Sequence, residues 1–246
     1  MQWRLSPFAG AMILPLAGAV QADIFQGEAI DEVEESRWQS EIEYGLVVTT
    51  GNTDTESSSG SLVVVHEAPK WRQRTALRTL RSADEGVVTA ERHTASYKVD
   101  YKFRPKDYAF FAMRYEDDRF SGLDYRVSEA VGYGRRIVEG ERVRLDAEVG
   151  AGMIHERPEG GDRSDEEMGR LAADLRWIIT EGARFSQTVL VERSNATYAE
   201  SDTGLTTTVG GNLSMRVSYQ VRYNSEVPPE TEKTDTMLGV NLVYSF

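Results

Sequence analysis

The residues most capable of chemistry in this sequence are three histidines and a pair of adjacent aspartates. His66, His93 and His155 each lack a second ligand at the spacing of a metal site. A lipase needs a serine and a histidine with an orienting side chain, and a protease that activates water between carboxylates also needs an Asp–His dyad. No histidine lies near a serine in such an arrangement, and the segment around Asp117 and Asp118 contains no histidine. The sequence therefore predicts neither an enzyme nor a cofactor site.

Acidic segments offer a second kind of chemistry, the binding of a divalent cation. Asp117–Asp124 and Glu159–Glu167 carry several carboxylates, whose oxygens suit Ca²⁺ or Mg²⁺. Solvated loops have the same composition, and we favour that interpretation. We therefore predict no metal site.

A third set consists of charged residues that alternate with apolar ones. In 213–223, Arg216 and Arg222 share one face with small polar residues, whereas Leu, Met, Val and Tyr occupy the other face. The same separation occurs in 95–103 and 143–153. Because successive side chains of a strand point to opposite faces, each of these segments has one charged face and one face compatible with lipid. The candidate pore-lining residues on the charged faces are Arg72, Arg74, Arg78, Lys98, Asp100, Lys102, Arg114, Glu116, Arg144, Asp146, Glu148, Arg170, Asp174, Arg176, Arg216 and Arg222.

Segments of this kind recur along the chain, with no convincing amphipathic helix between them. The last, Thr234–Phe246, ends on an aromatic residue, which is typical of the closing strand of a membrane barrel. A closed ladder pairs every backbone group, as a hydrocarbon environment requires. The predicted fold is therefore all-β, a closed antiparallel transmembrane β-barrel of about twelve strands. We expect these strands at 39–50, 54–66, 70–82, 90–103, 107–119, 125–138, 142–156, 164–177, 183–193, 199–209, 212–224 and 234–246.

Two of these segments fit the alternation less well. The strand at 125–138 places Glu129 and Arg135 on the apolar face, and the serine-rich strand at 54–66 does not choose a face before Leu62. Either the register is shifted by one residue or these parts lie above the bilayer.

The connections between strands indicate an orientation. Short periplasmic turns opposite longer external loops are usual in outer-membrane barrels, and an even number of strands places both ends of the barrel on the periplasmic side. Gly51-Asn52-Thr53 is an exception, because it is a short connection on the external side. Tight turns are expected at 67–69, 105–106, 139–141, 180–182 and 210–211, and longer loops at 83–89, 117–124, 156–166, 194–201 and 225–233.

The N-terminal residues are expected to lie outside the barrel wall. Arg4 precedes an apolar run at 7–20, and a small-x-small pattern ends at Ala22, which together predict a secretory signal peptide. A single anchoring helix is the alternative, but the run is shorter than the ~20 residues that a span needs. The acidic lead-in that follows could also fold back into the barrel as a plug. The predicted division is 1–22 signal peptide, 23–38 acidic periplasmic lead-in and 39–246 transmembrane barrel.

Composition excludes several classes of protein. A hydrophobic content of 40% and a mean hydropathy of −0.46 argue against a bundle of membrane helices. The absence of cysteine excludes disulfides, thiolate metal sites and a lipid anchor on cysteine. A net charge of −12 argues against nucleic acid as a partner, because phosphate contacts need an excess of Lys and Arg. We expect a monomer. Its expected partners are outer-membrane lipids, lipopolysaccharide, and the barrel assembly machinery, which would act on the C-terminal strand. In one alternative, divalent cations bridge the acidic loops to lipopolysaccharide.

Three motifs resemble a known family. GLVVTTGNTDTESS at Gly45–Ser58, YEDDRFSGLDY at Tyr115–Tyr125, and Val227-Pro228-Pro229 followed by Thr234-Asp235-Thr236 look like the salt-induced outer membrane proteins, a domain of unknown function. The resemblance covers about residues 40–246. It implies an outer-membrane barrel and an association with salt stress, and it carries no established catalytic or ligand residue.

The charge of the predicted interior suggests two functions. Its bases outnumber its acids, which include Glu41 and Glu43 besides those named above, because most acids lie in the loops and the lead-in. Rings of Arg and Lys favour anions, so one hypothesis is a narrow channel for small anionic solutes. The alternative is that opposite charges pair and fill the interior, which leaves a non-conducting structural or adhesive barrel acting through its external loops. An open water path would favour the channel, and an exposed apolar patch in the loops would favour the alternative.

Overall fold

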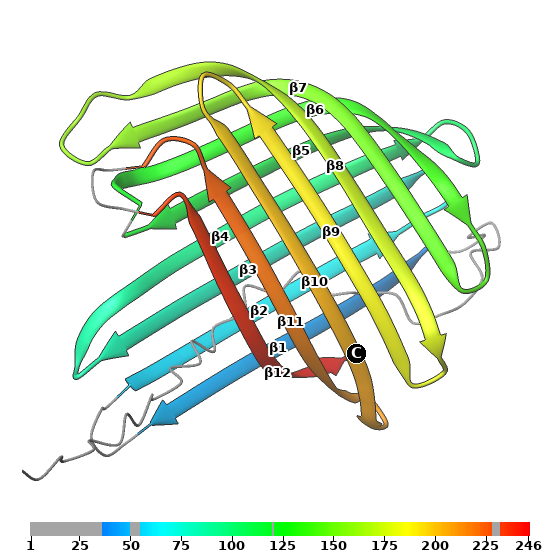
Figure 1. The fold of residues 1–246 in the computed structure, drawn as a ribbon. Coiled ribbons are helices and arrows are strands. Elements are labelled where there is room, and N and C mark those ends of the chain that lie inside the picture. Colours follow the sequence, from blue (N-terminus) through cyan, green and yellow to red (C-terminus); the bar gives the residue numbers. More distant parts are fainter. Residues whose placement is uncertain (1–35, 50–54, 120, 228–231) are drawn as a thin grey trace, which may run out of the picture.

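The fold in Figure 1 is that of a computed structural model, which describes residues 36–49, 55–119, 121–227 and 232–246. The predicted signal peptide, the lead-in as far as residue 35 and the Gly51-Asn52-Thr53 connection lie outside the described residues. Within the described ranges there is no helix long and apolar enough to cross a membrane. The strands are β1 (Arg37–Thr49), β2 (Thr55–Glu67), β3 (Trp71–Asp84), β4 (Val87–Lys102), β5 (Asp107–Asp118), β6 (Leu123–Glu139), β7 (Val143–Pro158), β8 (Ser164–Thr180), β9 (Ala183–Arg193), β10 (Thr197–Gly210), β11 (Leu213–Asn224) and β12 (Thr234–Ser245).

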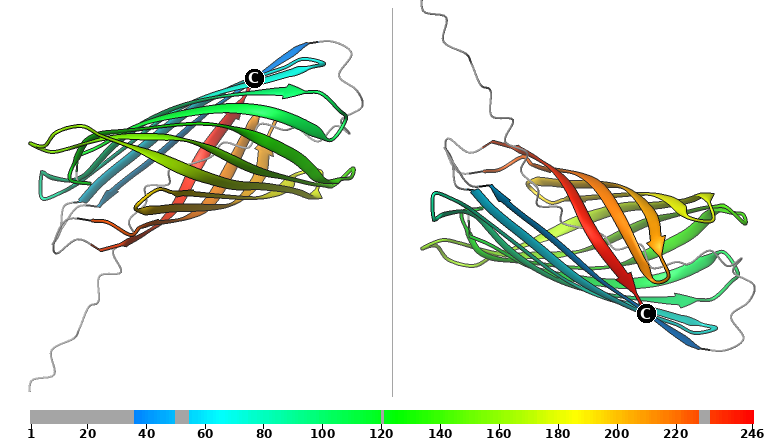
Figure 2. Two further views of the ribbon diagram at one scale, coloured as in Figure 1. Left: turned by 90° about the horizontal axis from the view of Figure 1, so that it is seen from above. Right: turned by 90° about the horizontal axis from the view of Figure 1, so that it is seen from below.

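Each strand pairs antiparallel with its neighbours in the sequence, and β12 pairs with β1 to close the ring. The prediction of a closed antiparallel barrel of about twelve strands is confirmed. The views along two further directions show the strands wrapping around one interior at a strong tilt (Figure 2). Polar groups of the backbone are thereby paired within the wall, which is what lets such a sheet cross hydrocarbon.

Most strand boundaries follow the alternation, and the largest differences lie near the connections. β1 begins at Arg37, so Arg37 and Trp38 belong to the wall rather than to the lead-in. The loop predicted at 83–89 is wrong, because β3 and β4 continue to a two-residue turn at Glu85-Gly86. Both turn residues have positive φ, 49° and 79°, the geometry that fits a tight hairpin to twisted strands.

The seam between β1 and β12 is the shortest pairing in the wall. Its register runs over Glu41–Tyr44 against Leu242–Ser245, and Ser40 and Phe246 add two backbone hydrogen bonds of 2.9 Å. Toward the other end of the barrel, which the loop lengths predict to be the external end, the two strands diverge (Figure 1). There, β1 continues to pair with β2 and β12 with β11.

Aromatic side chains on the outward face form two girdles. The one at the end that carries the short turns and the C-terminus is the larger, and it includes the contact pairs Trp71–Tyr101 and Tyr244–Phe246, with ring centroids 4.8 and 6.1 Å apart. Between the girdles the outward residues are mostly Leu, Val, Ala and Met. This belt is the face expected to meet lipid. The outward aromatics of the larger girdle are Trp38, Trp71, Tyr101, Phe103, Tyr133, Trp177, Phe185, Tyr244 and Phe246.

The two weakly alternating segments keep the register of the barrel. Glu129 and Arg135 do point outward, because Ser128, Ala130 and Arg136 between and beside them are buried. Arg135 donates to Asp107 at 3.2 Å near the turn end of β6. Glu129 is nearer the middle of β6 and lies 3.5 Å from His155 on β7. Each of these outward charges therefore has a polar partner on a neighbouring strand.

Inward glycines make room for an aromatic ring inside the barrel. Phe110 on β5 is buried and faces Gly132 on β6 and Gly150 on β7. A Cβ added at Gly132 would lie 2.3 Å from the Val149 carbonyl oxygen and 2.7 Å from the Phe110 ring. The close approach of ring and backbone thus requires glycine at this position.

We predict that Gly132→Ala destabilises the barrel by about 1–3 kcal/mol, because the wall and the Phe110 ring must move to accept the methyl group. The matched control is Gly169→Ala on β8, where an added Cβ meets nothing within 4 Å. Urea unfolding of both variants in lipid vesicles, followed by tryptophan fluorescence, provides the measurement. Equal midpoints for the two variants would contradict the assigned packing.

Candidate functional site: the barrel interior

Every predicted pore-lining residue lies on the inward face of its strand. Inward and outward positions are separated by burial, which alternates along the strands, and by contacts that cross the interior. Their role in a pore remains a proposal, since facing inward does not establish a path. The positions are Arg72, Arg74 and Arg78 on β3, Lys98, Asp100 and Lys102 on β4, Arg114 and Glu116 on β5, Arg144, Asp146 and Glu148 on β7, Arg170, Asp174 and Arg176 on β8, and Arg216 and Arg222 on β11.

Several inward residues were missed by the sequence analysis. All but Glu67 lie at even-numbered positions of β4, β5, β6, β9 and β10, which face inward there, and Glu67 lies at an inward odd-numbered position of β2. The missed residues add three bases and five acids, so the inward bases named here still outnumber the inward acids, by 14 to 12 instead of the predicted 11 to 7. The missed inward residues are Glu67, Arg92, Tyr108, Phe110, Asp118, Arg126, Arg136, Glu192, Tyr198, Glu200 and Asp202.

One layer of paired charges crosses the interior near the external end, and we call it the outer layer: Arg114, Glu116, Tyr198, Glu200 and Arg222. Arg222 on β11 pairs with Glu116 on β5, and these strands stand opposite each other in the ring. Arg114 reaches Glu116 at 2.7 Å and Glu200 at 3.0 Å. The Tyr198 hydroxyl donates to Glu200 at 2.6 Å, and both arginines lie over its ring. Each charge of the layer is therefore compensated by side chains from the other wall.

A second layer lies nearer the periplasmic turns, and we call it the inner layer: Lys98, Tyr108, Phe110, Glu148 and Arg170. Glu148 on β7 accepts from Lys98 at 2.5 Å, from Arg170 at 2.7 Å and from the Tyr108 hydroxyl at 2.9 Å. Lys98 and Arg170 also lie 5.4 and 5.0 Å from the centre of the Phe110 ring. Like the outer layer, this one combines an aromatic ring, cations and a shared carboxylate.

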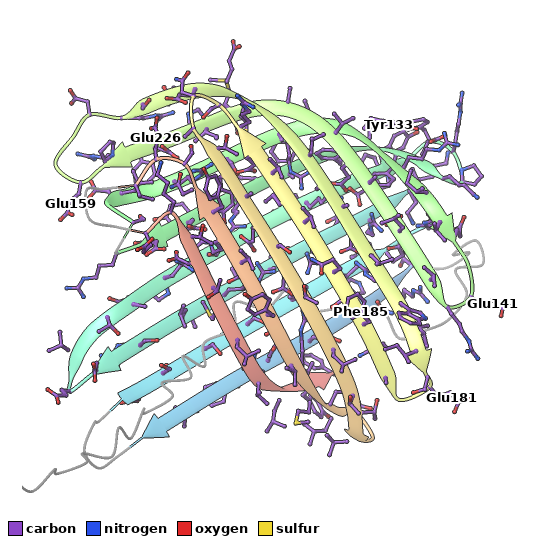
Figure 3. The ribbon with its side chains drawn as sticks, in the orientation of Figure 1. Tyr133, Glu141, Glu159, Glu181, Phe185 and Glu226 are labelled. Carbon is purple, nitrogen blue, oxygen red and sulfur yellow. The ribbon has the colours of Figure 1, made fainter. Side chains whose placement is uncertain are left out.

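The two layers separate three cavities. An outer cavity of about 300 Å³ is lined by Glu116 and Tyr198 among others, and a middle cavity of about 120 Å³ by Arg78 and Arg114. An inner cavity of about 90 Å³ lies beside Tyr108. Side chains, not backbone, divide the described interior. Figure 3 shows how densely these side chains fill it, while Glu159 and Glu226 lie at one rim and Glu141 and Glu181 at the other.

The three histidines lie on the outward face and are engaged locally. His66 stacks on Trp38 at 4.3 Å, and His93 shares a hydrogen bond of 3.0 Å with Thr79. His155 lies beyond the apolar belt, where it contacts Asp165 at 2.6 Å. In the described part of the chain, no three His, Asp or Glu side chains are grouped to hold a metal ion.

The external end of the β7–β8 hairpin carries one charge cluster outside the membrane. Hydrogen bonds with His155 and with Arg163, at 2.6 Å each, lower the pKa of the Asp165 carboxyl below its ordinary value. Asp165 is therefore ionised at neutral pH and ties the hairpin end together. It is exposed, and its partners in the described structure are His155 and Arg163.

The comparison with protein families decides the family. The family described as "Protein of unknown function, DUF481" matches residues 42–246. The chain belongs to this family. The prediction of an outer-membrane barrel family of unknown function is thus confirmed, and the association with salt stress remains a prediction.

This DUF481 chain is similar in sequence to a protein of Escherichia coli and in structure to solved outer-membrane proteins. The uncharacterized protein YdiY of Escherichia coli (strain K12) is 24% identical over 244 residues, which cover 96% of this chain and 94% of YdiY. The COG4313 outer membrane channel from Pseudomonas putida F1 is similar at a TM-score of 0.50 and 12% identity, over 92% of this chain and 100% of that one. The translocator domain of autotransporter NalP from Neisseria meningitidis gives 0.47 and 13%, over 86% and 88%. At 12% identity the channel from Pseudomonas putida supports the outer-membrane barrel fold alone.

We predict that Arg222→Met destabilises the protein by about 3 kcal/mol, because removing one partner leaves Glu116 buried with a weaker set of cations. The side chains of Glu116 and Arg222 are only 10% and 9% exposed. The control is Arg119→Met, whose partner Glu91 is 3.1 Å away but whose own side chain is 65% exposed, and it should cost at most about 1 kcal/mol.

The same urea titration in vesicles measures both variants. Adding Glu116→Gln to Arg222→Met should recover part of the loss, because the orphaned charge is then removed as well. If Arg222→Met and Arg119→Met unfold at the same urea concentration, the ion pairs of the outer layer do not contribute the stability predicted for them.

Proposed function

We propose that this protein is a narrow outer-membrane channel for small solutes, whose path is closed in the described conformation by the outer and inner layers. The observation that supports it is the series of three cavities along the interior, each with charged side chains in its lining and divided from the next only by side chains. A barrel wall needs no such row of cavities merely to stay in the membrane. The arrangement is therefore better suited to passing solutes than to serving only as a scaffold.

The layers can open without unfolding the wall. Arg, Lys and Glu side chains turn about several single bonds, and rotamer changes occur far faster than strand separation. In the outer layer, Arg114 already has two carboxylates within reach, so it can exchange partners while its charge stays compensated. In the inner layer, Lys98 likewise contacts Asp100 at 2.6 Å as well as Glu148. Alternative pairings thus lower the cost of opening.

A preference for anions is part of the proposal, and it rests on the middle cavity. Its lining includes Arg74, Arg78, Lys98, Arg114 and Arg170. The acids in the lining are fewer, three against five cations. Glu200 pairs with Arg114, whereas Glu192 and Asp202 pair with arginines outside the lining, Arg126 at 3.5 Å and Arg216 at 2.8 Å. A solute in this cavity therefore meets a positive potential, which favours anions.

The competing function is a non-conducting barrel that acts through its loops. The ion pairs that close the interior are compatible with it. At one external connection an adhesive patch has little support, because the 83–89 segment is a short hairpin whose one large exposed apolar side chain is Val87. The channel is therefore the stronger proposal.

Conductance across planar lipid bilayers tests the channel. The wild-type protein should be mostly closed, with small and infrequent current steps. A variant that removes one charge pair from each layer, Glu116→Ser with Arg222→Ser and Glu148→Ser with Arg170→Ser, should conduct with steps several-fold larger. Neutral pairs remain in both layers, Arg114 with Glu200 and Lys98 with Asp100, so no charge is left orphaned.

A control variant, Glu91→Ser with Arg119→Ser, removes an exposed pair and should leave the current unchanged. The reversal potential in a KCl gradient reports selectivity, and we expect preference for Cl⁻ over K⁺. A correctly folded four-residue variant without current above the lipid baseline would refute the channel. Cation preference would refute only the anion selectivity.

A further inference from the structure

The middle cavity has a lining divided between charge and hydrocarbon. Its cations come from β3, β4, β5 and β8, and Ala112, Ala130, Met168, Ala172 and Leu190 add apolar side chains from β5, β6, β8 and β9. Ala130 and Met168 are almost fully buried, at 3% and 4% exposure. Its volume of about 120 Å³ is enough for several ordered waters or one small ligand. A cavity that only stored water would have little use for the apolar half.

Arg78 is the cation of this cavity whose charge is least compensated. Its Nε atom is buried and has no hydrogen-bond partner among the described residues, and no ion pair within 4.0 Å is found for its guanidinium there. The nearby Glu200 and Asp202 are committed to Arg114 and Arg216 at 3.0 and 2.8 Å. A half-buried cation whose Nε donor is buried and unused is costly, so an anion bound beside the guanidinium would offset much of that cost.

We infer that the middle cavity binds a short-chain carboxylate, with its carboxylate on Arg78 and its hydrocarbon part against Ala130 and Met168. Guanidinium groups bind carboxylates through two parallel hydrogen bonds, which suits the free edge of Arg78. Burial of a few methylene groups against the apolar side adds affinity at about 0.8 kcal/mol each. This inference rests on the proposed function, because it takes the middle cavity to be a binding site along the proposed channel. It adds the chemical class of the solute.

Butyrate, compared with phosphate and with chloride at equal ionic strength, is the probe. The protein is refolded into vesicles with the anion present, so that entry through a closed layer is not required. Binding to the folded state alone multiplies the folded-to-unfolded ratio by one plus the ligand concentration over Kd, or about elevenfold at ten times Kd. We expect butyrate to raise the urea midpoint accordingly, and phosphate and chloride to raise it much less.

Two variants locate the binding. Arg78→Met should itself raise the urea midpoint without ligand, because it removes an uncompensated buried charge, and should weaken butyrate binding about tenfold or more. Ala130→Leu should fill the apolar half and abolish the butyrate shift while leaving the charges in place. Arg92→Met is the control, since Arg92 lines the outer cavity and pairs with Asp118 at 2.5 Å, and its butyrate shift should equal that of the wild type.

The outcomes separate this inference from the proposed channel. An equal butyrate shift in the wild type and in Arg78→Met would overturn the site, as would a phosphate shift as large as that of butyrate. No butyrate shift in a protein that conducts would overturn the site and leave the channel standing. A butyrate shift in a protein that never conducts would support the site and refute the channel.

Discussion

The structure depends on one constraint: a backbone that crosses hydrocarbon must pair all its polar groups within the chain. A closed antiparallel ring meets this constraint, and it divides every strand into an outward and an inward face. Outward positions become apolar with aromatics at the two interfaces, as β12 and β8 illustrate through Tyr244 and Trp177. Inward positions are free to be polar, but only if they are compensated, because little bulk water reaches them. Both the wall and its interior chemistry follow from this division.

The interior meets that second requirement by pairing across the ring. A sheet offers each charge its neighbours on adjacent strands, and Arg72 uses one of these, Asp100 on β4 at 2.6 Å. The outer layer goes further, since Glu116 and Arg222 come from opposite walls. Arg114, Arg126 and Arg222 all lie over the ring of Tyr198. Cation–π attraction to this ring offsets part of the repulsion between the three arginines. The result is an interior that is filled and polar at the same time.

Sequence alone predicts the parts of this arrangement that have a short period. Alternation placed β11 and β7 almost to the residue and assigned Arg216, Asp146 and Glu148 to the inward face. It could not predict who pairs with whom, because Glu116 and Arg222 are 106 residues apart and meet only through the tilt and stagger of the closed ring. It also missed Tyr108 and Phe110. Large aromatic side chains are expected to face lipid, and only the glycines opposite them on β6 and β7 show that there is room for them inside.

The short β1–β12 seam changes how the interior layers should be understood. Among the described residues, Glu41–Tyr44 and the adjacent Ser40 alone join β1 to β12, so the described wall of β10, β11 and β12 has little support from β1 near the external end. The outer layer ties that same wall to β5 through Arg222–Glu116 and Glu200–Arg114. Side chains that close the path therefore also hold the wall in place. Opening must then proceed by exchange of ion-pair partners within the outer layer. If all the ion pairs of the layer broke at once, the short β1–β12 seam alone would have to keep the barrel closed.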